Sequence, residues 1–218
     1  MSLEIDQILV GHFGVFCYLI TEPASREGVL VDPGAEPARI LRKIRQREAR
    51  LRWIVCTHAH PDHVGGVARV RLETRASLVL HRQEAGTLRR LTHRVLVRLV
   101  GGKPVPRPDH LVEDGDTLEI GSSAVKILHT PGHSRGGICL LAEGHLFSGD
   151  TLFVGSVGRT DFPGASWDEL STSLREKILC LPGDTRVWPG HDYGDQPTST
   201  MGREKETNPY ITDFILDK

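Results

Sequence analysis

The stretch Thr57-His58-Ala59-His60-Pro61-Asp62-His63 places four metal-binding side chains within six residues. It follows the apolar run 53–56, which is typical of a buried strand that ends in a loop. In extended backbone, residues i and i+2 point to one side, so His58 and His60 are expected to aim at a common point. Pro61 suits the first turn of a helix, which would bring Asp62 and His63 round to the same place. The stretch therefore predicts a metal-binding loop at a strand end, in preference to a solvated His-rich loop.

Composition sets broad limits on the class of protein. The chain has 218 residues, of which 25% are charged, and a formal net charge of -1. Such a balance gives no global attraction to nucleic acid or to a membrane surface. The amino terminus lacks a signal pattern, and no run of about 18 apolar residues occurs. We therefore expect a cytoplasmic protein that binds neither nucleic acid nor membrane, and the sequence indicates no particular oligomeric state.

The four cysteines are far apart and form no CxxC pair: Cys17, Cys56, Cys139 and Cys180. Most lie in apolar runs, so we expect all of them to be buried, reduced thiols. Cys56 precedes His58 by two residues, but as part of the predicted strand it is expected to pack in the core and not to bind metal.

Strands and helices alternate along the chain in an order that is repeated. The first half has predicted strands at 5–10, 15–20 and 28–31, a helix from 37 to about 50, and strands at 53–56 and 77–80. The second half has predicted strands at 116–120, 124–129, 137–141 and 145–148, a helix at 167–179 and a strand at 185–188. The tail 198–218 has room for one short helix. This order predicts an α/β fold with one domain over residues 1–218, made of two similar halves.

Residues 83–100 are expected to form one amphipathic helix with four apolar residues on one side: Leu88, Leu91, Val95 and Leu99. Seven Lys or Arg residues lie in the segment 82–107, against Glu84 alone. Such a run is either a solvated face or a surface that attracts an anionic substrate.

Three later motifs each add one chelating side chain after a predicted strand: Thr130-Pro131-Gly132-His133-Ser134, Ser148-Gly149-Asp150-Thr151 and Trp188-Pro189-Gly190-His191-Asp192. Loops at strand ends are where binding sites are built. With the loop at 57–63 they supply five His and two Asp, which exceeds the four ligands of one tetrahedral site. The sequence therefore predicts two divalent transition metal ions. Nitrogen and oxygen ligands without thiolate suit zinc, iron or manganese.

The order of these motifs resembles the metallo-β-lactamase superfamily. Within it, Gly149-Asp150-Thr151-Leu152-Phe153 and Pro189-Gly190-His191-Asp192-Tyr193 resemble the glyoxalase II-like hydrolases, which act on hydroxyacylglutathione. The resemblance covers the chain from Asp32-Pro33-Gly34 to Asn208-Pro209-Tyr210 and implies an αββα sandwich. It also implies that His58, His60 and His133 hold one metal ion, that Asp62, His63 and His191 hold the other, and that Asp150 bridges them.

A pair of ions lowers the pKa of a shared water and polarises the carbonyl that the hydroxide attacks. The expected activity is a dinuclear, metal-dependent hydrolase, a thioesterase that acts on a small-molecule, glutathione-type thioester through a metal-bridging hydroxide. Zinc is the first choice of metal. Asp62 is the expected catalytic residue, because it could orient the hydroxide or take its proton.

The resemblance implies substrate-binding roles for two further residues. Tyr193 matches the glutathione-contacting tyrosine of the family, and Arg159 falls at its basic position in the loop after the bridging Asp. The structural alternatives are a salt bridge for Arg159 and a loop-packing ring for Tyr193. Full-length glyoxalase II enzymes carry a C-terminal helical domain, whereas only residues 192–218 follow His191. Part of the thiol-binding surface is therefore expected to be missing or rebuilt.

Two alternative functions remain. Gly158-Arg159-Thr160-Asp161-Phe162, and His191-Asp192-Tyr193 followed by Ser199-Thr200, are similar to persulfide dioxygenases of the same superfamily. Those enzymes match all seven chelating positions but use one iron, held by the equivalents of His58, His133 and Asp150, which suits oxygen chemistry. The other alternative is a catalytically silent binding or scaffold module, and the seven retained chelators argue against it.

Overall fold

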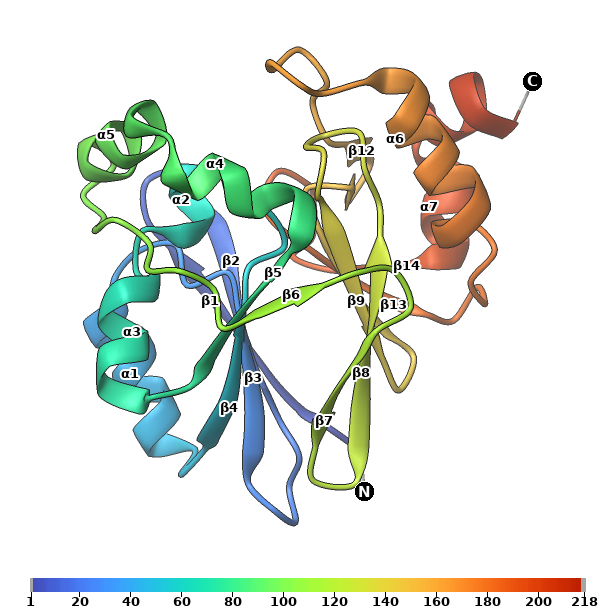
Figure 1. Ribbon diagram of the computed structural model, residues 1–218. Coiled ribbons are helices and arrows are strands. Elements are labelled where there is room, and N and C mark those ends of the chain that lie inside the picture. Colours follow the sequence, from blue (N-terminus) through green and yellow to red (C-terminus); the bar gives the residue numbers. More distant parts are fainter. Residues whose placement is uncertain (1, 217–218) are drawn as a thin grey trace.

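Two six-stranded β-sheets lie at the centre of this computed structural model, which describes residues 2–216 (Figure 1). The first sheet has the order β1-β2-β3-β4-β5-β6, antiparallel from β1 to β3 and parallel from β3 to β6. Its strands are β1 (Glu4–Val10), β2 (Val15–Thr21), β3 (Glu27–Val31), β4 (Arg50–Val55), β5 (Ser77–His81) and β6 (His110–Val112).

The second sheet has the order β14-β13-β10-β9-β8-β7. Its strands are β7 (Thr117–Ile120), β8 (Ser123–His129), β9 (Ile138–Ala142), β10 (His145–Gly149), β13 (Arg186–Pro189) and β14 (Ser199–Thr200). A small hairpin joins β11 (Leu152–Phe153) to β12 (Ser156–Val157).

Helices cover the outer face of each sheet (Figure 1). The first half contributes α1 (Pro37–Gln46), α2 (Pro61–Val64), α3 (Val67–Thr74), the 3₁₀ turn η1 (Arg82–Glu84), α4 (Ala85–Arg89) and α5 (Leu91–Leu99). The second half contributes α6 (Trp167–Ser173), the π-helical turn η2 (Leu174–Ile178), α7 (Met201–Thr207), α8 (Pro209–Ile211) and the π-helical turn η3 (Thr212–Leu216). None of the helices in the described part of the chain is long and apolar enough to cross a membrane.

Strand β2 shows why the molecule has four layers. Its seven residues are all buried, and successive side chains point to opposite faces of the sheet. Cys17 and Leu19 pack in one cluster with apolar residues of α1 and α3, whereas Tyr18 and Ile20 pack against the second sheet. A third cluster joins the outer face of the second sheet to α6 and α7. The expected αββα sandwich, an α/β fold, is confirmed.

Strand direction brings the predicted site loops together. Strands β3, β4 and β5 are parallel, so the loop 57–63 lies at the carboxyl edge of the first sheet. In the second sheet β10 and β13 are parallel, and β8 is antiparallel to β9, which is antiparallel to β10. The loops that follow β8, β10 and β13 therefore lie at one edge. Backbone hydrogen bonds join the two edges, from Ile138 N to Thr57 O at 2.9 Å and from Phe16 N to Gly190 O at 2.8 Å.

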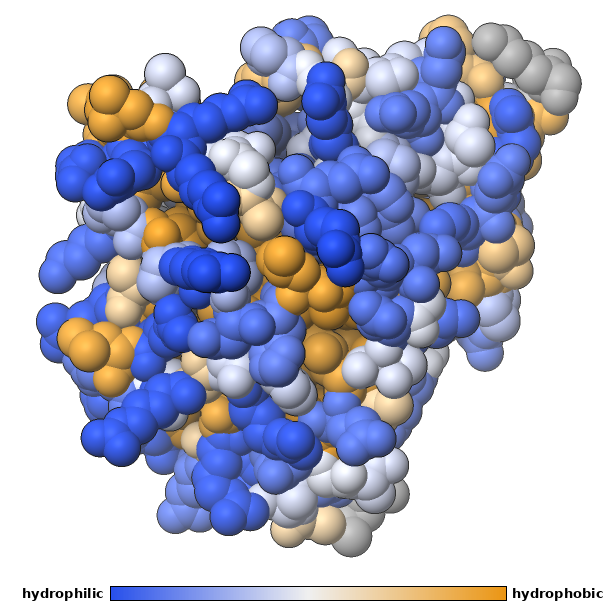
Figure 2. Space-filling model, in the orientation of Figure 1, coloured by the Kyte–Doolittle hydropathy of each residue, from blue (hydrophilic) through white to orange (hydrophobic). Residues whose placement is uncertain are grey.

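The prediction of one amphipathic helix over 83–100 is wrong. Extended backbone at Arg90 separates α4 from α5. Three of the four residues expected on the buried side are exposed: Leu91, Val95 and Leu99. The opposite face is buried instead, because His93 Nε2 bonds to Ala59 O at 2.6 Å and Val97 packs in the core. The space-filling view shows hydrophobic residues at the surface over α5 (Figure 2).

Other differences arise where the chain leaves the two sheets. Cys180 was expected to be buried but is exposed, because it lies in the turn after η2, outside both sheets. The tail holds more than the one expected helix, since Thr200 caps α7 and Asn208 caps α8. The last two residues of that tail, 217 and 218, lie outside the described range. The short strands β6, β11, β12 and β14 were not predicted.

Candidate metal centre

The loop after β4 has the predicted geometry. His60 is extended, with φ -64° and ψ 144°, and Pro61 begins α2. His58 and His63 are buried, and Cys56 packs in the core as expected. Within this single helical turn the ring of His63 lies 4.2 Å from that of His58, and Asp62 Oδ2 lies 3.9 Å from His63 Nε2. Asp62 is the more accessible of the two, since 23% of its side chain is exposed, against none for His63.

All seven predicted chelators come together from four loops. In each of three groups, the potential ligand atoms lie within 4.8 Å of one another: His58, His60 and His133; His58, His63 and Asp150; Asp62, His63 and His191. The first and third groups are the two ligand sets that the family resemblance implied. The structure therefore contains two adjacent triplets of candidate metal ligands.

Asp150 lies between the two triplets. Its Oδ2 is 3.4 Å from His133 Nε2 and 3.4 Å from His191 Nε2, and its Oδ1 is 3.4 Å from His63 Nε2. The carboxylate follows β10 directly and is nearly buried. One Asp150 carboxylate thus reaches both sets, which is the position expected of a bridging ligand.

Hydrogen bonds on the far side of the rings orient the imidazoles. His133 Nδ1 bonds to Arg159 O at 2.8 Å, and His191 Nδ1 bonds to Phe13 O at 2.8 Å. A carbonyl oxygen only accepts, so each Nδ1 carries a proton and each ring directs its Nε2 into the cluster. His63 Nδ1 likewise faces Asp32 Oδ2 at 2.9 Å. Such partners hold a metal-binding His in the correct tautomer.

Two further observations fit a cation at this place. His63 Nε2 and His191 Nε2 lie 3.0 Å apart, so a proton or a metal ion has to lie between these two nitrogens. His58 Nε2 and Asp150 Oδ1 are buried without a hydrogen-bond partner. Buried polar atoms are normally satisfied, and a metal ion bound here would satisfy both of these. The nitrogen and oxygen donors suit a transition metal ion.

The electrostatics of the cluster also favour positive charge. Burial by itself would lower the pKa of His63, but the carboxylates of Asp150 and Asp32 raise that pKa to about 10. Burial and the neighbouring His133 lower the pKa of His60 to about 4. Although burial opposes it, His63 and His191 hold the pKa of Asp150 well below its usual range. The buried Asp150 carboxylate is therefore held in its ionised form, which favours positive charge beside it.

Glycines allow the loops to approach closely. A Cβ at Gly190 would lie 2.3 Å from Asp150 Oδ1, and a Cβ at Gly34 would lie 1.7 Å from Asp62 O. Neither contact is possible for another residue without movement of the backbone. Gly190 and Gly34 therefore help to set the positions of the candidate ligands.

The two predicted substrate-binding residues lie at the rim of the centre. Arg159 donates to Asp161 from Nε at 3.0 Å and from an Nη at 2.7 Å, and it lies over the ring of Phe162 at 4.7 Å. Tyr193 is largely exposed and stacks on His191, with ring centroids 4.5 Å apart. Their roles in substrate binding stay predictions. The ring of Phe162 also lies 5.2 Å from that of His60, so this loop closes one side of the site.

Sequence reasoning missed the residues that support the ligands. Asp32 accepts hydrogen bonds from Thr57 N and Thr57 Oγ1, both at 2.7 Å, besides contacting His63. It does so from left-handed backbone, with φ 47°. In the sequence, the run Asp32-Pro33-Gly34 marked only the start of the family resemblance, and nothing tied Phe13 O or His93 to the ligand loops. These contacts depend on the tertiary structure.

Comparisons with known proteins agree with this geometry. The family model described as the metallo-beta-lactamase superfamily matches residues 10–191. The chain therefore belongs to this superfamily, whose members are metal-dependent enzymes and mostly hydrolases. The expected superfamily is confirmed, and the cluster is its metal-binding site.

Individual relatives have different activities. The human mitochondrial persulfide dioxygenase ETHE1 is 35% identical over 203 residues, which cover 90% of this chain and 71% of that protein. The crystal structure of the BLEG-1 B3 metallo-β-lactamase has 34% sequence identity to this chain and a TM-score of 0.87. The match covers 96% of this chain and 100% of the BLEG-1 chain. The crystal structure of TTHA1623 in a di-iron-bound form has 34% sequence identity to this chain and a TM-score of 0.79. The match covers 94% of this chain and 99% of the TTHA1623 chain. These relatives support a metal-dependent enzyme and leave the glyoxalase II-like activity a prediction.

Proposed function

We propose that this protein is a dinuclear metallohydrolase that cleaves small-molecule thioesters of the glutathione type. The observation that carries the proposal is the pair of triplets on either side of Asp150, each able to hold one ion. His58, His60 and His133 would hold the first ion, Asp62, His63 and His191 the second, and Asp150 would contact both. The di-iron-bound relative supports two ions, and zinc remains the first choice, with iron or manganese as alternatives.

Two bound ions supply water activation at neutral pH and polarisation of the thioester carbonyl. The protein's part is to position the ligands and to move a proton. Asp62 is the proposed catalytic residue, because its carboxylate is at the accessible side of the cluster and Oδ2 lies 3.6 Å from His191 Nε2. From there it can orient water or accept its proton. A thiolate leaving group needs little help from a general acid.

Arg159 and Tyr193 are the proposed contacts to the thiol carrier. Both lie at the rim, and Arg159 offers an anionic carboxylate the same planar donor pair that it now presents to Asp161. Arg90, from the basic segment 82–107, lines a cavity together with His60 and His133. These cations support an anionic carrier on this side of the centre.

The second candidate is a mononuclear iron persulfide dioxygenase. It is favoured by the identity to human ETHE1, which is about as high as the identity to TTHA1623. In this alternative His58, His133 and Asp150 would hold the one iron, as the resemblance implies. Asp62, His63 and His191 would then tune the site without holding an ion.

The test is to purify the protein without added metal, count its metal ions, and assay it for thioester hydrolysis and for oxygen uptake with glutathione persulfide. The proposal expects close to two equivalents of transition metal and hydrolysis that chelation abolishes. An active sample with one equivalent, all of it iron, would overturn it in favour of the dioxygenase.

A further inference from the structure

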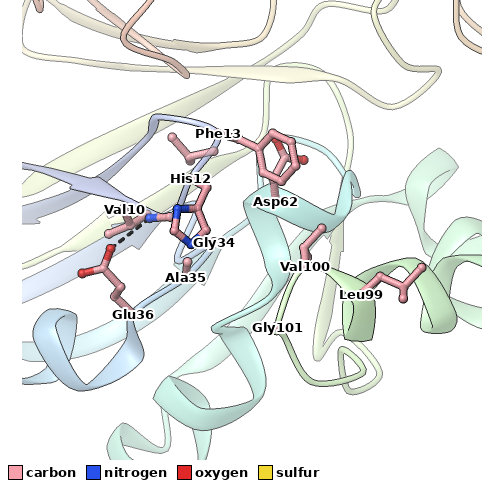
Figure 3. A pocket seen from close by; sticks show the side chains of 12 residues that line it. Val10, His12, Phe13, Gly34, Ala35, Glu36, Asp62, Leu99, Val100 and Gly101 are labelled. Atoms are coloured by element: carbon pink, nitrogen blue, oxygen red, sulfur yellow. Dashed lines mark hydrogen bonds between the residues drawn. The ribbon is translucent and has the colours of Figure 1, made fainter.

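A cavity of about 660 Å³ lies beside the metal centre, on the side of Asp62. The turn between β1 and β2, the loop at 34–36 and the carboxyl end of α5 form its walls (Figure 3). Six apolar residues line it: Val10, Phe13, Val15, Ala35, Leu99 and Val100. Phe13, Asp62 and Val100 come from three different elements and line the same space. The cavity therefore connects an apolar surface to a proposed catalytic carboxylate.

The lining of this cavity has the polar side chains of Glu36, His12 and Asp62. Glu36 accepts a hydrogen bond from Gly11 N at 3.0 Å, drawn as a dashed line in Figure 3, and one from Arg39 at 3.3 Å. Its carboxylate is thus already bonded within the protein. The other polar side chains of the lining are His12, which is exposed, and Asp62 itself. A ligand in the cavity would meet mainly hydrocarbon.

The opposite side of the centre is different in character. There, His60 and His133 line a cavity of about 290 Å³ with the polar and basic side chains of Gln83, Arg90 and Arg135. Glu84, the acidic residue of this lining, already accepts a hydrogen bond from Gly136 N at 2.9 Å. The two cavities meet the same ligand loop at His60 and at Asp62, two residues apart. A substrate that spans the centre would therefore have one apolar end and one anionic end.

We propose that the cavity beside Asp62 binds the acyl group of the substrate, and that the enzyme prefers thioesters of apolar acids. This inference rests on the proposed function and adds the substrate class. A volume of this size is within the range of small-molecule sites and accommodates an acyl chain of about six to eight carbons or an aromatic acyl group. A short or hydroxylated acyl group would leave the apolar walls in contact with water, and would gain less from binding.

The apolar wall is fixed to the metal centre through its backbone. Phe13 O accepts from His191 Nδ1 at 2.8 Å, and Gly14 O accepts from Asp192 N at 2.9 Å. The position of the β1–β2 turn is therefore tied to a candidate ligand. Substitution of the Phe13 side chain removes the wall and keeps the carbonyl that orients His191.

The experiment uses the metal-loaded protein and glutathione thioesters that differ only in acyl length, acetyl against hexanoyl. Each buried CH₂ is worth about fourfold in binding and the two acyl groups differ by four CH₂, so wild type is expected to favour hexanoyl in kcat/KM by up to about 250-fold. The variants are Phe13→Ala and Val100→Asp. Val95→Asp is the matched control, since Val95 is exposed on α5 and does not line the cavity.

Val100→Asp should reduce the preference for hexanoyl by tenfold or more, because it places a charge against the acyl chain. Phe13→Ala should reduce it several-fold without loss of metal, and Val95→Asp should leave it unchanged. The second measurement is the binding of hexanoate and of acetate to the same proteins by calorimetry. Hexanoate is expected to bind tighter than acetate to wild type, and this difference should fall in Val100→Asp.

The outcomes separate the two proposals. If no thioester is hydrolysed but hexanoate binds in a manner that depends on Val100, the proposed thioesterase function is wrong and binding of an apolar chain in the cavity is supported. If thioesters are hydrolysed without preference for hexanoyl, and hexanoate binds no tighter than acetate, the proposed acyl-binding role of the cavity is wrong and the thioesterase function is supported. Equal effects of Val100→Asp and Val95→Asp would also overturn the acyl site.

Discussion

At the scale of single residues, Asp32 supports the centre although it belongs to neither set of candidate ligands. It holds Thr57 at the end of β4 and His63 in the ligand loop with one carboxylate. Asp32→Asn keeps the shape but leaves one oxygen to accept from three donors. We expect metal affinity to fall about 10- to 100-fold, as for other partners of metal-binding His.

Competition with a chromogenic chelator measures this affinity. Asp184→Asn is the control, because it removes the same charge from an exposed position before β13, whereas the candidate ligand His191 follows the other end of that strand. Equal affinities of Asp32→Asn and Asp184→Asn would show that Asp32 does not position His63.

Arg159 offers a second prediction at this scale. If its guanidinium exchanges Asp161 for a carboxylate of the thiol carrier, Arg159→Ala should raise KM by about tenfold with little change in kcat, because ground state and transition state share the contact. The variant keeps the Arg159 carbonyl that orients His133. Steady-state kinetics with glutathione thioesters measures both constants.

Arg52→Ala is the matched control for this variant, since Arg52 also pairs with a carboxylate, that of Glu27, and lies over an aromatic ring, that of Trp53. An unchanged KM in Arg159→Ala would assign Arg159 to the salt bridge with Asp161.

At the scale of elements, Asp6 attaches β1 to the end of α1. Its side chain is 10% exposed, and it pairs with Arg47 at 2.7 Å and Lys43 at 3.6 Å. Burial would raise the pKa of Asp6, but hydrogen bonding and charge from Arg47, with Lys43, lower it overall. A depressed pKa stabilises the fold above the unfolded-state pKa of about 4, and this stabilisation disappears as pH falls through the folded-state pKa.

Asp6→Asn should therefore lower the free energy of unfolding at pH 7 by about 1–3 kcal/mol, with the difference from wild type shrinking below about pH 4. Urea titrations at several pH values measure it. Asp195→Asn is the control. The side chain of Asp195 is 65% exposed, so its ion pair with Arg203 should contribute less than about 1 kcal/mol. A difference for Asp6→Asn that is the same at pH 7 and pH 3.5 would contradict the assignment.

The sequence predicts elements well where pattern and burial agree. The alternation that places Cys17 and Leu19 on one face of β2, and Tyr18 and Ile20 on the other, is local, and so the sheets were predictable. Helix α5 was not. Leu91, Val95 and Leu99 have helical spacing, but the contact from His93 to Ala59 O decides which face is buried. That contact spans 34 residues and leaves no local signal.

At the scale of the whole molecule, the candidate ligands were predictable because each follows a strand end and carries its own motif. The supporting shell was not predictable, since Phe13 and His191 are 178 residues apart in the chain and meet only in the folded protein. The acyl cavity has the same origin, because its walls come from β1–β2, the loop at 34–36 and α5. Whether residues 1–218 consist of two similar halves stays a prediction.

The central claim is that the second triplet holds an ion that hydrolysis needs, and His191→Ala tests it most directly. The measurement is the metal content of this variant together with its rates of thioester hydrolysis and of oxygen uptake with glutathione persulfide. His133→Ala serves as a reference that should be inactive in either mechanism. We expect metal content to fall from about two equivalents to about one, and hydrolysis to fall by about 10² or more. Oxygen uptake in wild type that survives in His191→Ala, with no thioester hydrolysis in either protein, would contradict the account.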